Sequence, residues 1–293
     1  MASWRFEAIG TLWEIETTDT LSEVMRDAVS ATIAEFDRTW SRFREDSEVA
    51  RLGRSGGRIV SADAAPMLDL YADLTSATQG GVNPLIADSL SALGYDADYS
   101  LVARPPVQAP SGWDEQLSWT ETGVSASSAS MLDIGALGKG RLIDLVMQVL
   151  ADLPGDVVVD AGGDIRLRGA GVRIALEHPF DSRKAIGVIE ARDQALCASA
   201  INRRAWGEGL HHVLDGRTGL PVRTWAATWA VAPEAMRADA AATALFFDGG
   251  AQLANEWEVD WVRMSTDGRV EYSANCPAEL FLTGGNTRPA PER

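Results

Sequence analysis

Apolar and polar residues alternate near the start of the chain, in residues 5–8 and again in residues 12–17. This period of two predicts a pair of half-buried β-strands, and Gly10 between them predicts the turn that joins them. Thr20 and Glu23 then have the spacing of a capping box, which predicts the first turn of a helix. A period near 3.6 residues gives that helix a buried face made of Leu21, Val24, Met25, Ala28, Ile33 and Phe36.

Strand-like and helix-like patterns continue along the chain without a strict order. Apolar periodicity predicts helices at residues 63–78 and 236–247, and another after residue 140. Short apolar runs predict strands at residues 157–159, 172–176, 185–189, 226–231, 261–264 and 270–272. Because strands and helices do not alternate regularly, we expect an α+β fold with layered antiparallel or mixed sheets and flanking helices.

Two proline-containing stretches suggest the domain organisation. Residues 103–112 contain three prolines and are the expected boundary between two subregions of a single domain at 1–282. Residues 283–293 are polar and contain two prolines, which predicts a disordered tail.

Composition and charge narrow the possible functions. An apolar content of 46% and a charged content of 23% over 293 residues are ordinary for a soluble globular protein. The net charge of -16 argues against a nucleic-acid partner, since nothing offsets phosphate repulsion. We find no window as long as a membrane span and no signal-peptide core, so we expect a cytoplasmic protein without membrane insertion. Cys197 and Cys276 match neither a metal-binding spacing nor a disulfide framework.

One glycine-rich stretch has the chemistry of a phosphate site. Residues 131–144 read MLDIGALGKGRLID, with Gly135, Gly138 and Gly140 around Lys139 and an amphipathic run directly after them. Glycine lets the backbone approach a ligand, and the N-terminus of the following helix attracts anions. The stretch fits neither a Walker A loop, which needs Ser or Thr after the lysine, nor a Rossmann fingerprint. Alone, it also fits a plain turn before a helix.

Asp239 and Thr243 are four residues apart at the start of a predicted helix, so their oxygens project from one face. A carboxylate and a hydroxyl are hard ligands that suit Mg²⁺ or Ca²⁺ and suit zinc poorly. In isolation, the pair also fits an acidic residue at a helix N-terminus followed by a threonine bonded to the preceding turn.

His211 and His212 are two of the three histidines in the chain, and they stand close to Asp215 and Thr218. A histidine beside an anion-binding turn could carry a proton. Neighbouring residues of a strand point to opposite faces, so at most one of the two histidines should face a site. The alternative is one surface histidine and one structural histidine beside an ordinary turn.

Taken together, six stretches resemble the motifs of the ApbE family of FAD:protein FMN transferases in both order and spacing. The resemblance extends from about residue 5 to residue 282. The matching stretches are residues 37–47, 81–84, 132–144, 160–164, 209–222 and 238–244.

This resemblance implies an α+β fold that binds FAD and Mg²⁺. Family members transfer FMN from FAD to a threonine hydroxyl of an acceptor protein and release AMP, and some hydrolyse FAD to FMN and AMP instead. The implied metal ligands are Asp239, Thr243 and the backbone carbonyl of Gly138, and the implied catalytic residues are His212 and Asp239. The implied FAD-binding residues are Gly10, Thr11, Asn83, Lys139, Asp144, Gly162, Gly163, Ser199, His212, Asp215 and Thr218.

The sequence departs from the family pattern in several places. The T-S-G motif is Ala198-Ser199-Ala200 here, which removes one hydroxyl and adds a methyl group, and M-G-T is Ile9-Gly10-Thr11. Because the six stretches keep the family's order, the leading hypothesis is an Mg²⁺-dependent enzyme that transfers FMN. The alternatives are an FAD pyrophosphatase that uses water as the acceptor, and a flavin-binding protein without catalysis.

Overall fold

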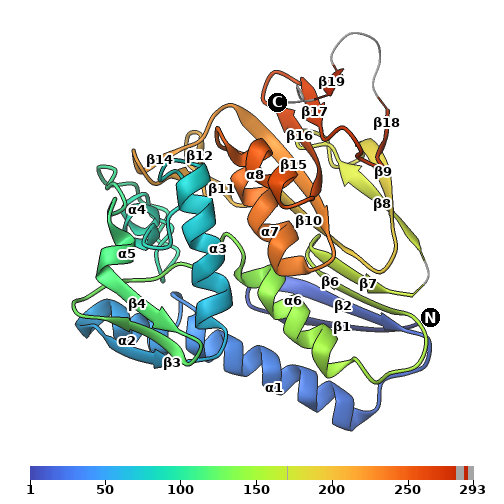
Figure 1. Cartoon of the computed structure of the whole chain (residues 1–293), viewed down its shortest axis with the longest axis horizontal. Helices are drawn as coiled ribbons and strands as arrows, with labels where there is room; N and C mark the ends of the chain where they lie inside the picture. Colours follow the sequence, from blue (N-terminus) through green and yellow to red (C-terminus); the bar gives the residue numbers. More distant parts are fainter. Residues whose placement is uncertain (170, 282–286, 290–293) are drawn as a thin grey trace.

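A nine-stranded sheet forms the central layer of the computed structural model (Figure 1), which describes residues 1–169, 171–281 and 287–289. Neighbouring strands pair antiparallel throughout, except for the parallel pair at one edge, β17 with β19. In spatial order the strands are β1 (Ala2–Ala8), β2 (Thr11–Thr17), β6 (Val157–Ala161), β7 (Ile165–Arg168), β10 (Ala195–Ala200), β15 (Trp225–Ala232), β16 (Asp260–Ser265), β17 (Val270–Tyr272) and β19 (Thr287–Pro289).

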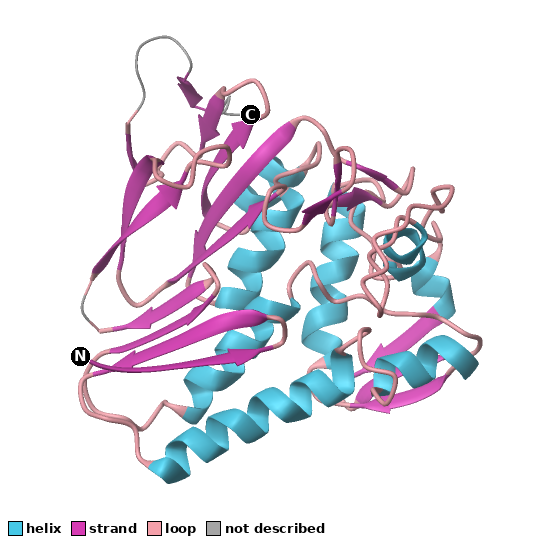
Figure 2. Cartoon of the chain, turned by 180° about the vertical axis from the view of Figure 1, so that it is seen from behind, coloured by secondary structure: helices cyan, strands magenta, loops and turns pink. Residues whose placement is uncertain are grey.

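Helices cover one face of this sheet, as the view from behind shows most clearly (Figure 2). Helix α6 contacts β6, and α7 contacts α6, β10 and β15. The helices are α1 (Glu23–Trp40), α2 (Glu48–Ser55), α3 (Ala64–Ala77), α4 (Ala87–Ala92), α5 (Trp113–Gln116), α6 (Gly138–Val149), α7 (Ala235–Ala244) and α8 (Gly250–Glu256).

A second, three-stranded sheet packs against the large sheet through a separate apolar cluster. It consists of β8 (Val172–Glu177), β9 (Ala185–Ala191) and β18 (Glu279–Leu280). Strand β15 therefore contributes to two cores: Ala230 belongs to the main one, whereas Trp229 belongs to the one beneath β8 and β9. A strand that is buried on both faces needs no polar alternation, which explains why Thr228 is the only polar residue of β15.

The remaining strands are short. A three-stranded sheet lies beside α2 and α3, and two hairpins of two-residue strands follow β10 in the chain. The sheet contains β3 (Gly57–Val60), β5 (Gly123–Ala126) and β4 (Leu117–Thr120), and the hairpins are β11 (Ala205–Trp206) with β12 (Leu210–His211) and β13 (Leu214–Asp215) with β14 (Leu220–Pro221).

The predicted fold class is confirmed: the chain folds as an α+β protein with antiparallel and mixed sheets and flanking helices. The start of α1 differs from the expectation. Ser22, and not Thr20, caps the helix by accepting a hydrogen bond from the amide of Met25. The buried face also shifts to Val29, Ile33, Phe36 and Trp40, with spacings of four, three and four, and Val24 lies off that face at 79% exposure.

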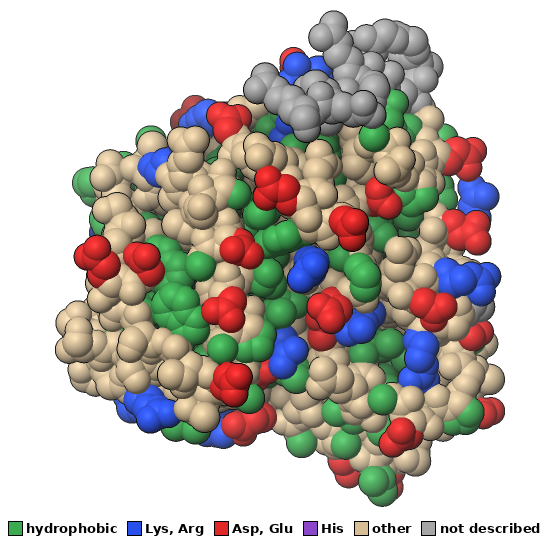
Figure 3. Space-filling model, viewed as in Figure 1, with side chains coloured by type: hydrophobic (Ala, Val, Ile, Leu, Met, Phe, Trp, Pro, Cys, Tyr) green, Lys and Arg blue, Asp and Glu red, His purple; other side chains and the backbone are tan. Residues whose placement is uncertain are grey.

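The main hydrophobic cluster extends from Trp13 to Trp261 and contains residues from both sides of the loop at 103–112. Of the expected tail at 283–293, residues 287–289 form β19, and the others lie outside the described residues. Over the described part of the chain, no helix is both long and apolar enough to cross a membrane. Acidic and basic side chains are interspersed on the face shown in Figure 3.

Candidate active site

A cavity of about 770 Å³ lies where the helical layer, the small hairpins and the turn between β1 and β2 meet. This volume falls within the range that holds cofactor-sized ligands. Seven of the residues expected at the site from the sequence line this cavity. They are Gly10, Asn83, Gly138, Lys139, Ser199, His212 and Thr243.

The glycine-rich stretch lies in the cavity wall and leads directly into α6, which begins at Gly138. Gly140 allows α6 and α7 to approach closely, because a Cβ atom there would lie 2.2 Å from the carbonyl oxygen of Ala235. The amide of Gly140 donates to Oδ2 of Asp239 at 2.9 Å, which ties the two helices together. The sequence therefore brings a helix N-terminus, with its affinity for anions, to the edge of the cavity.

Oxygen atoms from α7 and the glycine-rich stretch lie close together. Thr243 Oγ1 donates to the carbonyl oxygen of Ala136 at 3.1 Å, and Asp239 is buried one helical turn before Thr243. Two oxygens that bind Mg²⁺ at adjacent positions, each at about 2.0–2.1 Å, lie about 2.9 Å from each other. The separation of Thr243 and Ala136 fits such a pair, so the Ala136 carbonyl is a candidate ligand beside that of Gly138.

The charge at Asp239 also fits a cation. Burial, followed by repulsion from Asp164, raises the pKa of Asp239 well above its usual range, so the ionised form lacks sufficient compensation in the protein alone. Among the described residues, no three His, Cys, Asp or Glu side chains gather into a metal cluster. A cation here would therefore depend on a carboxylate, a hydroxyl and a carbonyl, the set of hard oxygens that Mg²⁺ prefers.

Lys139 extends from the first turn of α6 and pairs with Asp164, with its Nζ 2.6 Å from Oδ2. Burial acts to lower the pKa of Lys139, but the carboxylates of Asp164 and Asp239 outweigh it and raise the pKa overall. The lysine is therefore charged and 25% exposed at the cavity, where a phosphate could reach it.

His211 and His212 have separate roles, as strand geometry predicts. His211 Nε2 lies 2.9 Å from the carbonyl oxygen of Val222, and its Nδ1 accepts from the amide of Val213 at 3.3 Å, so both ring nitrogens are occupied. His212 lines the cavity, and its buried Nδ1 has no hydrogen-bond partner among the described residues. Burial and the charge of Arg204 lower the pKa of His212 to about 3, which keeps the imidazole neutral.

Three other expected site residues shape the backbone around the cavity. The side chain of Asn83 donates to the carbonyl of Pro110 and accepts from the amide of Leu85. Both its nitrogen and its oxygen therefore already have a partner within the protein. Asp215 accepts from the amide of Arg217, and Thr218 Oγ1 accepts from the amide of Leu220. These bonds hold the turn between β13 and β14, which contacts the glycine at position 81 through the amide of Gly216.

Seven expected residues do not line the cavity. Three of them, Asp215, Thr218 and Asp239, are described above, and the other four are Thr11, Asp144, Gly162 and Gly163. Thr11 faces Gly162, and a Cβ atom added at Gly162 would lie 2.2 Å from Oγ1 of Thr11. Gly162 and Gly163 together form the turn between β6 and β7. Asp144 lies on the far side of α6, where it accepts from the amides of Ala235 and Met236 at the start of α7. It supports the helix that carries Asp239 and Thr243.

The sequence reasoning missed most of the aromatic wall of the cavity. Phe43 and Tyr99 stack with centroids 5.1 Å apart, and Tyr95 stacks on Trp206 at 5.4 Å. Phe43 stands within the first of the six matching stretches, which was the one available signal. Tyr95 and Tyr99 follow α4 in an irregular segment, where no periodicity marks which residues face a site.

Comparisons with known proteins show the family of this chain. The sequence matches the ApbE family over residues 9–261, well over half of the chain. It is 28% identical over 286 residues to an FAD:protein FMN transferase of Rhodobacter capsulatus, covering 89% of this chain and 52% of the relative. It is also 28% identical over 271 residues to an FAD:protein FMN transferase of Treponema pallidum (strain Nichols), covering 79% and 74%. The chain thus spans about half the length of the first relative.

Solved structures share the fold. The flavin transferase ApbE from Vibrio cholerae superposes with a TM-score of 0.76 at 22% identity, covering 93% of this chain and 97% of that one. The ApbE protein of Thermotoga maritima superposes with a TM-score of 0.79 at 19% identity and the same coverage.

Proposed function

The chain belongs to the ApbE family, and we propose that it is an Mg²⁺-dependent enzyme that transfers FMN from FAD to a threonine hydroxyl of an acceptor protein, releasing AMP. The names of its relatives in Rhodobacter and Treponema support the transferase activity. The observation that carries the proposal is that one cavity gathers Lys139, His212 and Thr243 beside an aromatic wall. We further propose that the protein acts in the cytoplasm.

The phosphate side of FAD would lie at the start of α6. The backbone amides of the first turn and the ammonium of Lys139 both attract anionic oxygens there. The planar rings of FAD would contact the aromatic wall formed by Phe43, Tyr95, Tyr99 and Trp206, since stacking favours flat heteroaromatic groups. This arrangement would let a strongly acidic protein hold an acidic ligand.

The proposed cation ligands are Asp239, Thr243 and a backbone carbonyl, either that of Gly138 or that of Ala136. The distance from Thr243 to Ala136 and the incomplete compensation of the buried Asp239 carboxylate support this assignment. A bound Mg²⁺ supplies charge neutralisation to the diphosphate and to the phosphoryl group in transfer.

His212 is the proposed proton acceptor. The threonine oxygen attacks the phosphorus of the FMN half, and the bond from that phosphorus to the bridging oxygen breaks, so that AMP leaves with the electron pair. The hydroxyl proton moves to Nδ1 of His212, which is neutral and unpartnered within the described residues. A negative diphosphate beside the imidazole would raise its pKa and strengthen it as a base.

The test is to incubate the purified protein with FAD, with and without Mg²⁺, and to quantify AMP and FMN by chromatography. Mg²⁺-dependent AMP accompanied by FMN covalently attached to a threonine of an added acceptor protein supports the transferase. AMP with free FMN identifies the pyrophosphatase instead. Tight FAD binding without AMP, even with the acceptor and Mg²⁺ present, identifies a flavin-binding protein, an outcome motivated by the altered Ala198-Ser199-Ala200 stretch.

A further inference from the structure

Arg42 is a buried arginine in the cavity wall, and its side chain is only 5% exposed. It follows α1 in the turn that leads to α2. A buried guanidinium is costly unless its charge and its N–H groups are matched, so its partners indicate why the fold retains it. The motif resemblance assigns it no role.

The first partner of Arg42 is Asp133, which precedes the glycine-rich stretch. Nε of Arg42 lies 2.5 Å from Oδ2 of Asp133, and the Asp133 side chain is 12% exposed. The other carboxylate oxygen of Asp133 accepts from the amide of Gly135 at 2.7 Å. The Asp133 carbonyl accepts from the hydroxyl of Tyr71 at 2.8 Å. Asp133 is thus held from three directions and fixes the backbone just before Ala136.

The second partner is the segment that carries Tyr95. Nη1 of Arg42 donates to the Tyr95 carbonyl at 2.8 Å. The guanidinium carbon lies 4.1 Å from the ring centroid of Phe43 and 4.9 Å from that of Tyr95, both within cation–π range. Arg42 therefore joins the turn after α1, the aromatic wall and the glycine-rich stretch.

The contacts of Arg42 lead to the proposed cation site. Asp133 holds the amide of Gly135, and the next residue, Ala136, offers the carbonyl that Thr243 contacts at 3.1 Å. Groups that orient metal ligands without touching the metal commonly change metal affinity when they are removed. We infer that Arg42 is a positioning residue for cation binding, acting through Asp133 on the carbonyl of Ala136. This inference rests on the proposed function, because it presupposes a cation at Ala136 and Thr243.

The sign of the effect separates positioning from simple electrostatics. Arg42 is positive, so if it acted through its charge alone, removing it would strengthen the binding of a cation. If Arg42 positions the carbonyl, removing it weakens the binding of the same cation. The two roles thus predict opposite changes for a variant in which Arg42 is neutral.

The experiment measures Mn²⁺ affinity by electron paramagnetic resonance, and FMN affinity by flavin fluorescence without metal, for wild type, Arg42→Met and Arg42→Lys. We expect Arg42→Met to lose about tenfold in Mn²⁺ affinity. Arg42→Lys should lose less, about threefold, because its ammonium keeps the charge but cannot reach Asp133 and Tyr95 with the same fork of donors. FMN affinity should fall by a smaller factor than Mn²⁺ affinity in both variants.

Two further variants complete the test. Arg51→Lys, on the exposed face of α2, should bind Mn²⁺ as wild type does. Asp133→Asn should weaken Mn²⁺ binding, and the double variant Arg42→Met/Asp133→Asn should be no weaker than the poorer single variant, because both changes break the same connection. Should Arg42→Met not fold, Arg42→Lys still decides the matter, because it keeps the positive charge and changes only the hydrogen-bond geometry.

The inference is overturned by wild-type or stronger Mn²⁺ affinity in Arg42→Met or in Arg42→Lys, or by equal losses of Mn²⁺ and FMN affinity. The proposed function fails in a different way: the wild-type protein itself would bind neither FAD nor Mn²⁺, and the inference would fall with it.

Discussion

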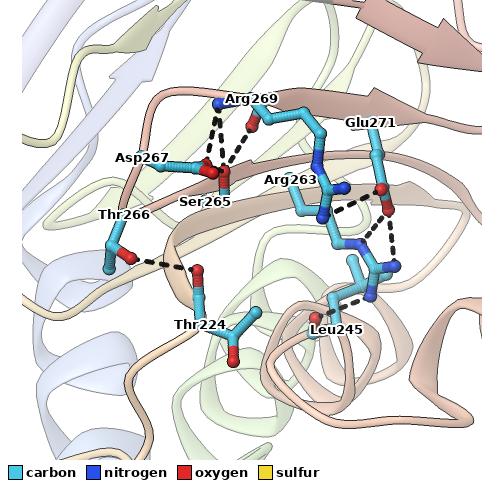
Figure 4. A network of polar contacts seen from close by, with 8 residues as sticks. All are labelled: Thr224, Leu245, Arg263, Ser265, Thr266, Asp267, Arg269 and Glu271. Carbon is cyan, nitrogen blue, oxygen red and sulfur yellow. Dashed lines mark hydrogen bonds and ion pairs between the residues drawn. The ribbon is translucent and has the colours of Figure 1, made fainter.

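Two clusters of buried charge lie in different parts of this molecule, and they differ in how completely their polar groups are matched. The first joins β16 and β17 (Figure 4). All three side-chain nitrogens of Arg263 donate there: Nε and Nη2 to Glu271 at 3.1 and 2.7 Å, and Nη1 to the Leu245 carbonyl at 3.2 Å. The guanidinium also lies 3.8 Å from the ring centroid of Trp225. We call this cluster complete, because each side-chain nitrogen of Arg263 has a hydrogen-bond partner within the protein.

The second cluster lies at the cavity, which Arg42 and His212 line, and it is incomplete within the described residues. His212 Nδ1 and Arg42 Nη2 are buried there without a hydrogen-bond partner, and Asp239 has a raised pKa because it is buried near Asp164. Unmatched buried groups are rare in folded proteins and need a physical reason. The first cluster therefore needs no ligand, whereas a ligand in the cavity would supply partners that the second cluster lacks.

The largest expected effect concerns Asp239. Asp239→Asn removes the carboxylate from the incomplete cluster but keeps an oxygen for the amide of Gly140. We expect Mg²⁺-dependent release of AMP from FAD to fall by more than about 100-fold, because the cation loses its only charged ligand among those proposed. Chromatography of AMP measures the effect. Turnover at the wild-type rate would remove Asp239 from the metal site.

His212 should have the next largest effect, and the effect should be selective. His212→Ala is expected to slow FMN transfer by about 100-fold, the lower end of the range for a lost general base. FAD affinity should change far less, because Nδ1 of His212 makes no hydrogen bond that fixes another described residue of the cavity. Comparing the rate constant of transfer with the dissociation constant of FAD measures both. Equal losses would make His212 a binding or structural residue.

In the complete cluster the same kind of change should affect stability and leave catalysis intact. Glu271→Gln leaves the guanidinium of Arg263 without its anion. We expect a loss of about 2 kcal/mol in the free energy of unfolding, less than for a fully buried pair because Glu271 is 19% exposed. Denaturant titration measures this loss, and AMP release below the unfolding transition should match wild type. A matching loss of activity would show that the two clusters are not functionally separate.

The smallest expected effect comes from strain at the edge of the cavity. Ile9 has a positive φ of 46°, next to Gly10 at 73°, as a two-residue type I′ hairpin requires, yet branched side chains rarely adopt this conformation. Ile9→Asn should therefore stabilise the fold by about 1 kcal/mol. FAD affinity should fall modestly, since Ile9 lines the cavity. If the midpoint of denaturant unfolding is the same in Ile9→Asn as in the wild type, the backbone at Ile9 is not strained.

The sequence predicted those parts of the molecule where one periodicity dominates. Helices α3 and α7 and strands β15 to β17 follow from local patterns, and the fold class follows from their mixture. The start of α1 was wrong because two overlapping caps, at Thr20 and Ser22, compete within one turn. Helix α2 was missed because its eight residues follow a polar stretch that reads as a loop.

For the site, too, local sequence motifs predicted some residues, and residues whose role depends on tertiary packing were missed. Motif order identified Lys139, His212 and Thr243, all of which line the cavity. It could not tell that Asp144 supports α7 from behind, because the direction of a helical side chain depends on packing. Nor could it find Arg42, whose partners Asp133 and Tyr95 are distant in sequence and meet it only in the folded chain.

The central claim is that FAD completes the unmatched cluster, and nitrogen NMR of ¹⁵N-histidine-labelled protein tests it most directly. The adjacent His211 serves as an internal reference, because both of its ring nitrogens already have partners. Without FAD, His212 should remain neutral between about pH 5 and pH 8, since burial lowers its pKa to about 3. Addition of FAD and Mg²⁺ should then shift the Nδ1 signal of His212 and leave both nitrogens of His211 nearly unchanged. Saturating FAD that leaves His212 unshifted, or that shifts the two histidines equally, would contradict the account.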